Sequence, residues 1–344
     1  MEINLISDTV TKPCVEMLDL MVRSNVGDDV FKEDPSVNEL EDLVANMFGM
    51  ESALFFPSGT MANQTAIKIH TQPGDQLICD KYAHVYNYEG GGVSFNSGVS
   101  CKLVDGDRGM FTNEQVVDSI NPPDFYHSPK TSLVCVENTT NKGGGACWDI
   151  SELQKIQQTC KENNLSYHLD GARIWNAIVK TDTKPFQYGE IFDSISVCLS
   201  KGLGCPVGSV LIGSKEFINK AVRVRKVLGG GMRQAGYLAT CGIFALKNNI
   251  DRLKYDHIKA KEIESIKQVS IEQIRSSNNS IKDEVLTIKI ALIFLFCFLP
   301  YTQPYMEKGF EILSNATTEF WYAVLIVYSG SFGLSTIKNI RGKK

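Results

Sequence analysis

The chain has 344 residues, and this length predicts one large domain and a smaller one. Its formal net charge is −4, so we expect no surface that binds nucleic acid or another polyanion. The N-terminus lacks the basic start and apolar run of a signal peptide. Its ten cysteines include no Cys-x-x-Cys pair, which favours reduced thiols in a cytoplasmic protein over disulfides or zinc.

Short apolar runs alternate with helical patterns along the chain, which predicts an α/β fold with a mostly parallel sheet. Residues 36–39 have the spacing of a capping box and open a predicted helix that keeps its apolar period to Phe48 and ends at Gly49. Residues 57–60 form a turn that leads into a helix over 61–70. Further strands are predicted at 53–56, 77–79, 132–136, 166–169, 194–199 and 207–212, and further helix starts at 112–115 and 149–152.

Two segments place charged side chains just past the ends of predicted strands, at the edge where open α/β sheets bind ligands. Lys201 follows one strand, and the segment HLDGAR places Asp170 and Arg173 after another. Pyridoxal 5′-phosphate (PLP) needs such a trio: an amine for a Schiff base, a carboxylate beside the pyridine nitrogen, and a cation near the ring or the substrate carboxylate. A lone lysine there would be a surface charge, but the three together indicate PLP.

Ser58, Gly59 and Thr60 join a strand to a helix, so their hydroxyls and backbone N–H groups can hold a phosphate at the helix N-terminus. The alternative is an ordinary capped turn. His84 lies shortly before three glycines, and its imidazole can stack on a pyridine ring and transfer protons, or be structural.

Two further segments have a binding and a structural interpretation. Lys226 and Arg233 flank Gly229–Gly231 and can meet a phosphate, or they can be solvated charges at a helix end. Residues 137–141 follow a strand, so their polar side chains can contact a ligand or cap the turn.

From about Leu5 to His257 the chain resembles the low-specificity L-threonine aldolases, which are PLP enzymes of fold type I. The matching segments are residues 7–11, 26–30, 58–60, the one around His84, 168–173, 200–209 and 229–236. The resemblance implies a large domain with a mostly parallel, seven-stranded type of sheet flanked by helices. It also implies a homo-oligomer, a dimer or tetramer with active sites at the dimer interface. The implied reaction splits L-threonine or L-allo-threonine into glycine and acetaldehyde, in threonine catabolism and glycine biosynthesis.

The resemblance assigns roles to individual residues. Lys201 forms the Schiff base, Asp170 pairs with the pyridinium nitrogen, and His84 stacks on the ring and is our first choice as base for the substrate hydroxyl. The implied phosphate-binding residues are Ser58, Gly59, Thr60, Lys226 and Arg233, with at least one of the last two reaching across a subunit interface. The implied substrate-binding residues are Ser7, Arg173 and Thr140.

Two departures from the family bear on the substrate. Thr140 stands where relatives commonly have a histidine that contacts the substrate hydroxyl. After about residue 270 we find no counterpart of the family's small C-terminal α+β domain, which contributes an arginine for the substrate carboxylate. Residues 290–299 and 320–328 are apolar runs shorter than the roughly 20 residues needed to span a bilayer, so a membrane protein is not expected. The tail can be a divergent domain, a membrane-associated segment, or a translated segment foreign to the normal protein.

These patterns divide the chain into an N-terminal arm (1–12), a large PLP-binding domain (13–250) and a C-terminal region (251–344) that diverges after about 270. Two alternatives to a threonine aldolase remain. One is another fold-type-I lyase acting on a β-substituted amino acid, and the other is a catalytically weak or inactive PLP-binding relative.

Overall fold

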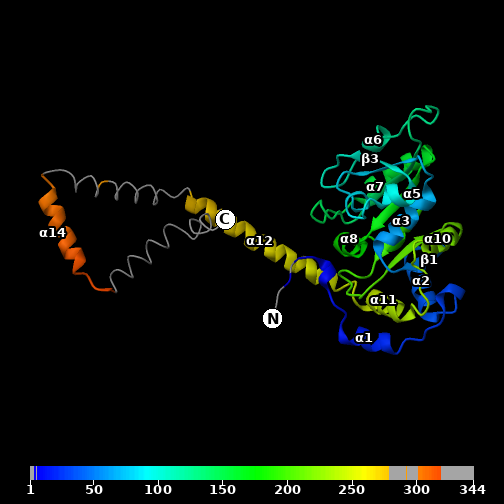
Figure 1. The fold of residues 1–344 in the computed structure, drawn as a ribbon, viewed down its shortest axis with the longest axis horizontal. Helices are drawn as coiled ribbons and strands as arrows, with labels where there is room; N and C mark the ends of the chain where they lie inside the picture. The colour runs from blue at the N-terminus through cyan, green and yellow to red at the C-terminus, as the bar shows by residue number, and fades with distance from the viewer. Residues whose placement is uncertain (1–3, 5, 279–291, 293–300, 319–344) are drawn as a thin grey trace. The chain divides into compact units, whose positions relative to one another are not determined.

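The computed structural model describes residues 4, 6–278, 292 and 301–318 (Figure 1). The chain divides into two compact units, Met1–Lys259 and Ala260–Lys344. The first unit holds the sheet and the helices around it. Helix α12 (Leu253–Asn278) begins in the first unit, and α14 (Gln303–Ser314) belongs to the second. Of the apolar runs noted in the sequence, 320–328 lies outside the described residues, and so does 290–299 apart from Leu292.

None of the helices in the described ranges combines the length and the apolar character needed to cross a membrane.

Seven strands form one sheet in the order β1-β7-β6-β5-β4-β2-β3. Strand β7 is antiparallel to both of its neighbours, β6 and β1, and the other pairs are parallel. The predicted α/β fold with a mostly parallel sheet is therefore confirmed. The strands are β1 (Ser52–Phe56), β2 (Gln76–Asp80), β3 (Ser100–Val104), β4 (Thr131–Glu137), β5 (Ser166–Gly171), β6 (Ser194–Cys198) and β7 (Ser209–Gly213).

Strand β3 was not predicted from the sequence. It pairs with β2 at the edge of the sheet, and its residues Ser100, Lys102 and Leu103 are exposed. An edge strand with so little burial lacks the apolar run by which the inner strands were recognised.

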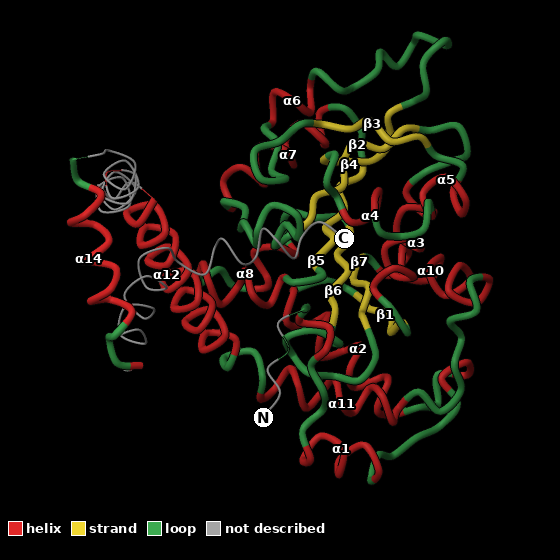
Figure 2. Tube along the Cα trace, turned by 60° about the vertical axis from the view of Figure 1, so that its left-hand side comes forward, coloured by secondary structure: helices red, strands yellow, loops and turns green. Residues whose placement is uncertain are grey.

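Helices cover both faces of the sheet (Figure 2). The helices of the first unit that precede α12 are α1 (Val15–Val22), α2 (Pro35–Phe48), α3 (Gly59–His70), α4 (His84–Asn87), α5 (Gly92–Ser97), α6 (Asn113–Val117), α7 (Ile150–Glu162), α8 (Ile174–Thr181), α9 (Pro185–Gly189), α10 (Lys215–Val227) and α11 (Gly236–Asn248), with single 3₁₀ turns at Asp8–Val10 and Asp29–Phe31.

Alternate residues of the inner strands pack into different clusters. On β4, Val134 and Val136 join the cluster that contains Leu153 of α7, whereas Leu133 and Cys135 join the one that contains Ile67 of α3. Burial on both faces is the usual state of a parallel sheet, and it explains why these strands read as continuous apolar runs.

The start of α2 corrects one prediction. Its N-cap is Asp34, whose carboxylate accepts the backbone N–H groups of Ser36 and Val37, both at 3.1 Å, so the cap lies before the expected Ser36. Pro35 occupies the first helical position, which suits its fixed φ. The predicted end at Gly49 is confirmed, with φ of 63° in the left-handed region that glycine favours.

Strand direction decides where the site forms. Because β1 and β6 both run antiparallel to β7, β1 runs in the same direction as the parallel strands, and their carboxyl ends meet at one edge. Strand β4 is paired with β5 so that Glu137 lies opposite Asp170 at this edge. Chain segments far apart in the sequence therefore come together here.

Candidate functional site

A cavity of about 370 Å³ opens at the carboxyl edge of the sheet. Four separate segments supply its predicted lining residues: the turn after β1, the start of α4, the end of β5 and the loop after β6. The structure thus brings together Ser58, Gly59, Thr60, His84, Asp170 and Lys201.

The turn after β1 leads directly into α3. Ser58 is the N-cap, and its Oγ accepts the N–H of Met61 at 3.2 Å. A Cβ on Gly59 would lie 2.7 Å from Cys198 Sγ, so a side chain does not fit where this turn packs against β6. Ser58 and Thr60 are exposed. The first N–H groups of a 12-residue helix therefore border the cavity, as an anion such as phosphate requires.

Asp170 is a buried carboxylate that lines the cavity, with 1% of its surface exposed. Its Oδ1 accepts the N–H of Ala172 at 3.1 Å, while Oδ2 is buried without a hydrogen-bond partner among the described residues. Burying a carboxylate oxygen without a partner is costly. A protonated ring nitrogen bound in the cavity would supply the partner, so the site fits the cofactor that the sequence predicts.

Lys201 lies in the loop between β6 and β7. Its backbone carbonyl accepts the N–H of Gly204 at 2.8 Å and the hydroxyl of Thr11 at 2.9 Å. The N-terminal arm therefore contributes to holding the lysine at the cavity, and Thr9 of the same arm lines it.

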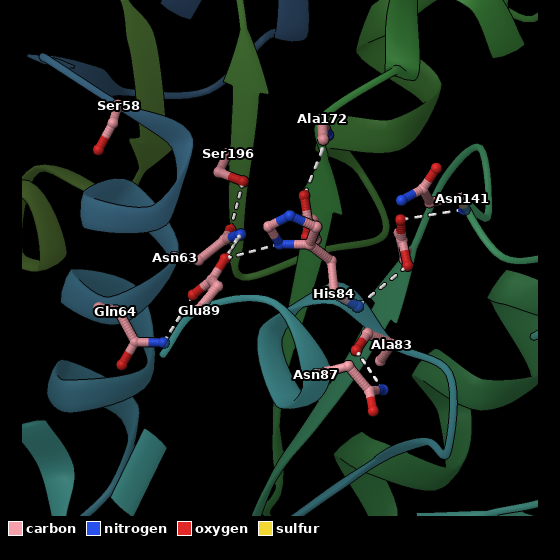
Figure 3. Close-up of polar contacts among 12 residues, drawn as sticks. Ser58, Asn63, Gln64, Ala83, His84, Asn87, Glu89, Asn141, Ala172 and Ser196 are labelled. Carbon is pink, nitrogen blue, oxygen red and sulfur yellow. Dashed lines mark hydrogen bonds and ion pairs between the residues drawn. The ribbon is translucent and has the colours of Figure 1, made fainter. Parts of the chain in front are cut away.

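His84 begins α4, and two carboxylates hold it (Figure 3). Its backbone N–H donates to Glu137 Oε2 at 3.2 Å, and its Nδ1 lies 3.2 Å from Glu89 Oε1. The hydrogen bond to Glu89 is the main cause that raises the pKa of His84, and the negative charges of Asp170, Glu89 and Glu137 act in the same direction.

Glu137 lies opposite Asp170 at the ends of adjacent strands. Burial, together with the negative charge of Asp170, raises the pKa of Glu137 to about 7. The backbone N–H groups of Asn141 and His84 donate to its two oxygens and oppose this rise.

Arg173 and Ser7 lie beside the cavity without lining it in the described part of the chain. The Arg173 guanidinium binds the Asp8 carboxylate through Nε and Nη2, both at 2.8 Å. Burial would raise the pKa of Asp8, but the hydrogen bonds and charge of Arg173 outweigh it, so the pKa is lowered. Ser7 Oγ caps the short turn that carries Asp8 and accepts the N–H of Thr9.

Three predicted site residues do not reach this cavity in their own chain. Lys226 lies in the last turn of α10, and Arg233 forms an ion pair with Asp28 at 2.9 Å. Thr140 lines a second and much smaller cavity, and its buried Oγ1 has no partner in the described ranges. The roles predicted for these three residues stay predictions.

Among the lining residues that the sequence did not reveal are two polar ones, Asn63 and Glu89, whose side chains bond to each other. Asn63 lies one helical turn after Gly59, where α3 faces the sheet and an apolar residue is expected. Glu89 lies five residues after His84, directly before the glycines at 90–92. Two features of the sequence could have revealed them: Asn63 is polar at a position of α3 where an apolar residue is expected, and Glu89 is an acidic residue close to His84.

Comparison with known proteins identifies what this chain is similar to. A family model described as beta-eliminating lyase matches residues 4–286. A low specificity L-threonine aldolase of Escherichia coli (strain K12) is 40% identical over 279 residues, which cover 80% of this chain and 83% of that protein. The low-specificity L-threonine aldolase 1 of Arabidopsis thaliana is 42% identical over 264 residues, covering 75% of this chain and 73% of the relative.

The fold also matches a solved structure of a threonine aldolase from Leishmania major, with a TM-score of 0.68. That match covers 76% of this chain and 77% of the other at 20% identity, so it bears on the fold alone.

Proposed function

The chain belongs to the beta-eliminating lyase family, and we propose that it is a PLP-dependent aldolase that cleaves L-threonine or L-allo-threonine into glycine and acetaldehyde. The observation that carries the proposal is the buried Oδ2 of Asp170, which has no partner among the described residues and lines one cavity with Lys201. The Escherichia coli and Arabidopsis thaliana relatives, 40% and 42% identical over the aligned residues, are named low-specificity L-threonine aldolases, which supports the substrate.

We propose that three parts of the cavity hold the cofactor. The amine of Lys201 would bind it covalently, Asp170 Oδ2 would accept a hydrogen bond from its ring nitrogen, and the N-terminus of α3 at Gly59 and Thr60 would hold its phosphate. When bound, PLP supplies the electron sink for the electron pair released as the Cα–Cβ bond breaks. The carboxylate of Asp170 favours that role because it raises the pKa of the ring nitrogen and keeps it charged.

His84 is the base that we propose for the substrate hydroxyl. The β-hydroxyl proton passes to the imidazole, and the O–H electron pair forms the carbonyl of acetaldehyde as the Cα–Cβ bond breaks. The electron pair of that bond stays with Cα, which takes up one proton from the protonated imidazole or from water to give glycine, so protons and electrons balance. His84 is the one histidine among the described residues that line the cavity, and the hydrogen bond to Glu89 raises its pKa. A base whose pKa lies near the working pH is the most effective one.

We propose that Arg173 and Ser7 bind the substrate carboxylate at the rim of the cavity. Arg173 already makes two hydrogen bonds with Asp8, so the substrate carboxylate has to share the guanidinium with that carboxylate. This competition predicts weaker substrate binding than an unpaired arginine would give.

We also propose a cytoplasmic homo-oligomer, a dimer or tetramer in which a second copy provides Lys226 or Arg233 to the phosphate. Its support is that neither residue lines the cavity of its own chain. Sedimentation of the purified protein tests the assembly. A monomer that binds PLP fully would contradict it.

An assay of the full-length protein tests the proposed function. Acetaldehyde and glycine should form in equal amounts from L-threonine or L-allo-threonine, faster than products form from serine or cysteine. Preferred turnover of serine or cysteine would instead assign another lyase of this fold. Because Thr140 occupies the position of the family's histidine, a PLP-binding protein without turnover is the second candidate, and a bound cofactor without products would identify it.

A further inference from the structure

Glu89 is buried, lines the cavity and is surrounded by hydrogen-bond donors (Figure 3). Its Oε1 accepts from Asn63 Nδ2 at 2.9 Å and lies 3.2 Å from His84 Nδ1. Its Oε2 accepts from Gln64 Nε2 at 2.6 Å. Both amides come from α3, so one helix holds this carboxylate in place.

The direction of the hydrogen bonds around Asn63 follows from its neighbours. A carboxylate only accepts, so the amide nitrogen of Asn63 faces Glu89 and its Oδ1 faces the sheet. There Oδ1 lies 2.5 Å from Ser196 Oγ and 3.1 Å from His168 Nε2. Both groups therefore donate to Asn63, and His168 carries its hydrogen on Nε2.

The same reasoning continues from His168 toward α3. Burial lowers the pKa of His168 to about 3, so its ring is neutral and Nδ1 accepts from the Ser194 hydroxyl at 2.8 Å. The Ser194 oxygen in turn accepts from His70 Nε2 at 2.7 Å. The hydrogen bonds thus run in one direction, from His70 through Ser194, His168 and Asn63 to Glu89. Aligned hydrogen bonds strengthen one another, so this series stabilises the Glu89 carboxylate.

We propose that Glu89 is a positioning residue that fixes the proton of His84 on Nδ1 and leaves Nε2 as the nitrogen that exchanges a proton with the substrate. This inference rests on the proposed function, in which His84 is the base. The contact has the required direction because Glu89 can only accept from Nδ1–H. A second group that fixes the tautomer of a catalytic imidazole is a recurrent requirement of general-base catalysis.

Other charged groups also face His84, from each element packed against it. Asp170 reaches it from β5 and Glu137 from β4, and both raise its pKa, while the ring of Tyr88 lies 5.7 Å away, directly after α4. Glu89 differs from the two other carboxylates because it is the one that contacts the imidazole itself, through Nδ1. Removing Glu89 should therefore change the tautomer, which the other two cannot hold.

Glu89→Gln tests the proposal because it keeps the shape and removes the charge. The chain has five histidines, so ¹⁵N-histidine spectra of the full-length protein with its cofactor, assigned with His84→Asn, report both nitrogens of His84. The unmodified protein should show the hydrogen on Nδ1, and Glu89→Gln should show a mixture of tautomers. The variant should also lose about tenfold or more in kcat, since a hydrogen bond to a charged group is lost.

The pH profile gives a readout that a purely structural role would not change. The base acts when Nε2 is unprotonated, so a raised pKa places the acid limb of kcat at higher pH. Glu89→Gln should move that limb to lower pH. Glu89→Asp keeps the charge, so the acid limb of its kcat profile should lie between the limbs of the unmodified protein and of Glu89→Gln. If Glu89→Gln does not fold, Glu89→Asp provides the test.

Glu152→Gln is the matched control, because Glu152 lies on α7 in an ion pair with Lys155 away from the cavity. It should leave the spectra, kcat and the acid limb unchanged. A hydrogen on Nε2 in the unmodified protein, or an acid limb that stays in place in Glu89→Gln, would overturn the proposal. Absence of threonine cleavage by the unmodified protein would refute the proposed function instead, and the tautomer measurement would still decide the role of Glu89.

Discussion

Replacing Asp170 by asparagine should separate cofactor binding from turnover. Asp170 Oδ1 accepts the N–H of Ala172, so an asparagine keeps that bond and turns its amide nitrogen to the place of Oδ2. An amide N–H can donate to an unprotonated ring nitrogen, so PLP should still bind. The ring nitrogen is then no longer kept charged, and the electron sink is weakened.

The size of the loss follows from the hydrogen bond that is changed. A bond to a charged group contributes about 1.5–3 kcal/mol, and 1.4 kcal/mol corresponds to a factor of ten, so kcat should fall by roughly 10- to 150-fold. Acetaldehyde release from L-threonine, measured beside the visible absorbance of bound PLP, gives turnover and occupancy in one sample. The charge of Asp170 also raises the pKa of Glu137, so that pKa should fall in the variant.

Asp80→Asn is the control for the loss of a buried carboxylate at a strand end. Asp80 ends β2, accepts the N–H groups of Tyr82 and Gly106, and does not line the main cavity in the described ranges. Its variant should keep both PLP and kcat if it folds. Near-normal turnover by Asp170→Asn with PLP bound would show that Asp170 does not maintain the electron sink.

Two further changes test the lysine and the paired carboxyls. Lys201→Ala should abolish the visible absorbance of covalently bound cofactor while circular dichroism shows an intact fold, and a borohydride-trappable link to another lysine would reject the assignment. The pKa of Glu137 is raised to about 7 in the folded protein, compared with about 4.5 in the unfolded chain. Between these two pH values the folded protein keeps a proton on Glu137 that the unfolded chain has released. The contribution of Glu137 to stability is therefore present below about pH 4.5 and is lost as the pH rises to about 7. Glu137→Gln lacks this loss. Between pH 5 and pH 8 its free energy of unfolding, measured in urea, should therefore fall by about 2–3 kcal/mol less than that of the unmodified protein. An unchanged difference between the two pH values would show that Glu137 does not titrate in this way.

The sequence predicted the sheet because burial leaves a clear pattern. Strands covered on both faces are apolar throughout, as in Leu133–Val136, and helix starts carry recognisable caps, as at Thr112 and Asp149. The carboxyl edge of a parallel sheet gathers whatever follows the strands, so the residue pattern by itself predicts that Asp170 and Lys201 lie together.

Contacts between distant segments could not be predicted in the same way. The hydrogen bond from Asn63 to Glu89 joins positions 26 residues apart, and nothing local in either segment specifies the partner. The ion pair of Arg173 with Asp8 spans 165 residues and changes what a free arginine at the rim was expected to do. A pattern of residue types shows where a polar group lies along its own element, but its partner depends on how the elements pack.

Thr140→His, which introduces the histidine that the resemblance implies at this position, should destabilise this chain without increasing turnover. Thr140 is 2% exposed, and a Cβ on Gly109 would lie 3.2 Å from its Cβ, so two loops already close over it. Arg108 ties these loops together through a 2.9 Å hydrogen bond from Nε to the carbonyl of Gly143. A larger ring at this position should cost about 1–3 kcal/mol in the free energy of unfolding. Thr140→Val is the matched control: it keeps the shape and removes a buried hydroxyl without a described partner, so it should be neutral or stabilising. A histidine variant that is as stable as the unmodified protein and cleaves threonine faster would show that the loops yield and that the lost imidazole limits this enzyme.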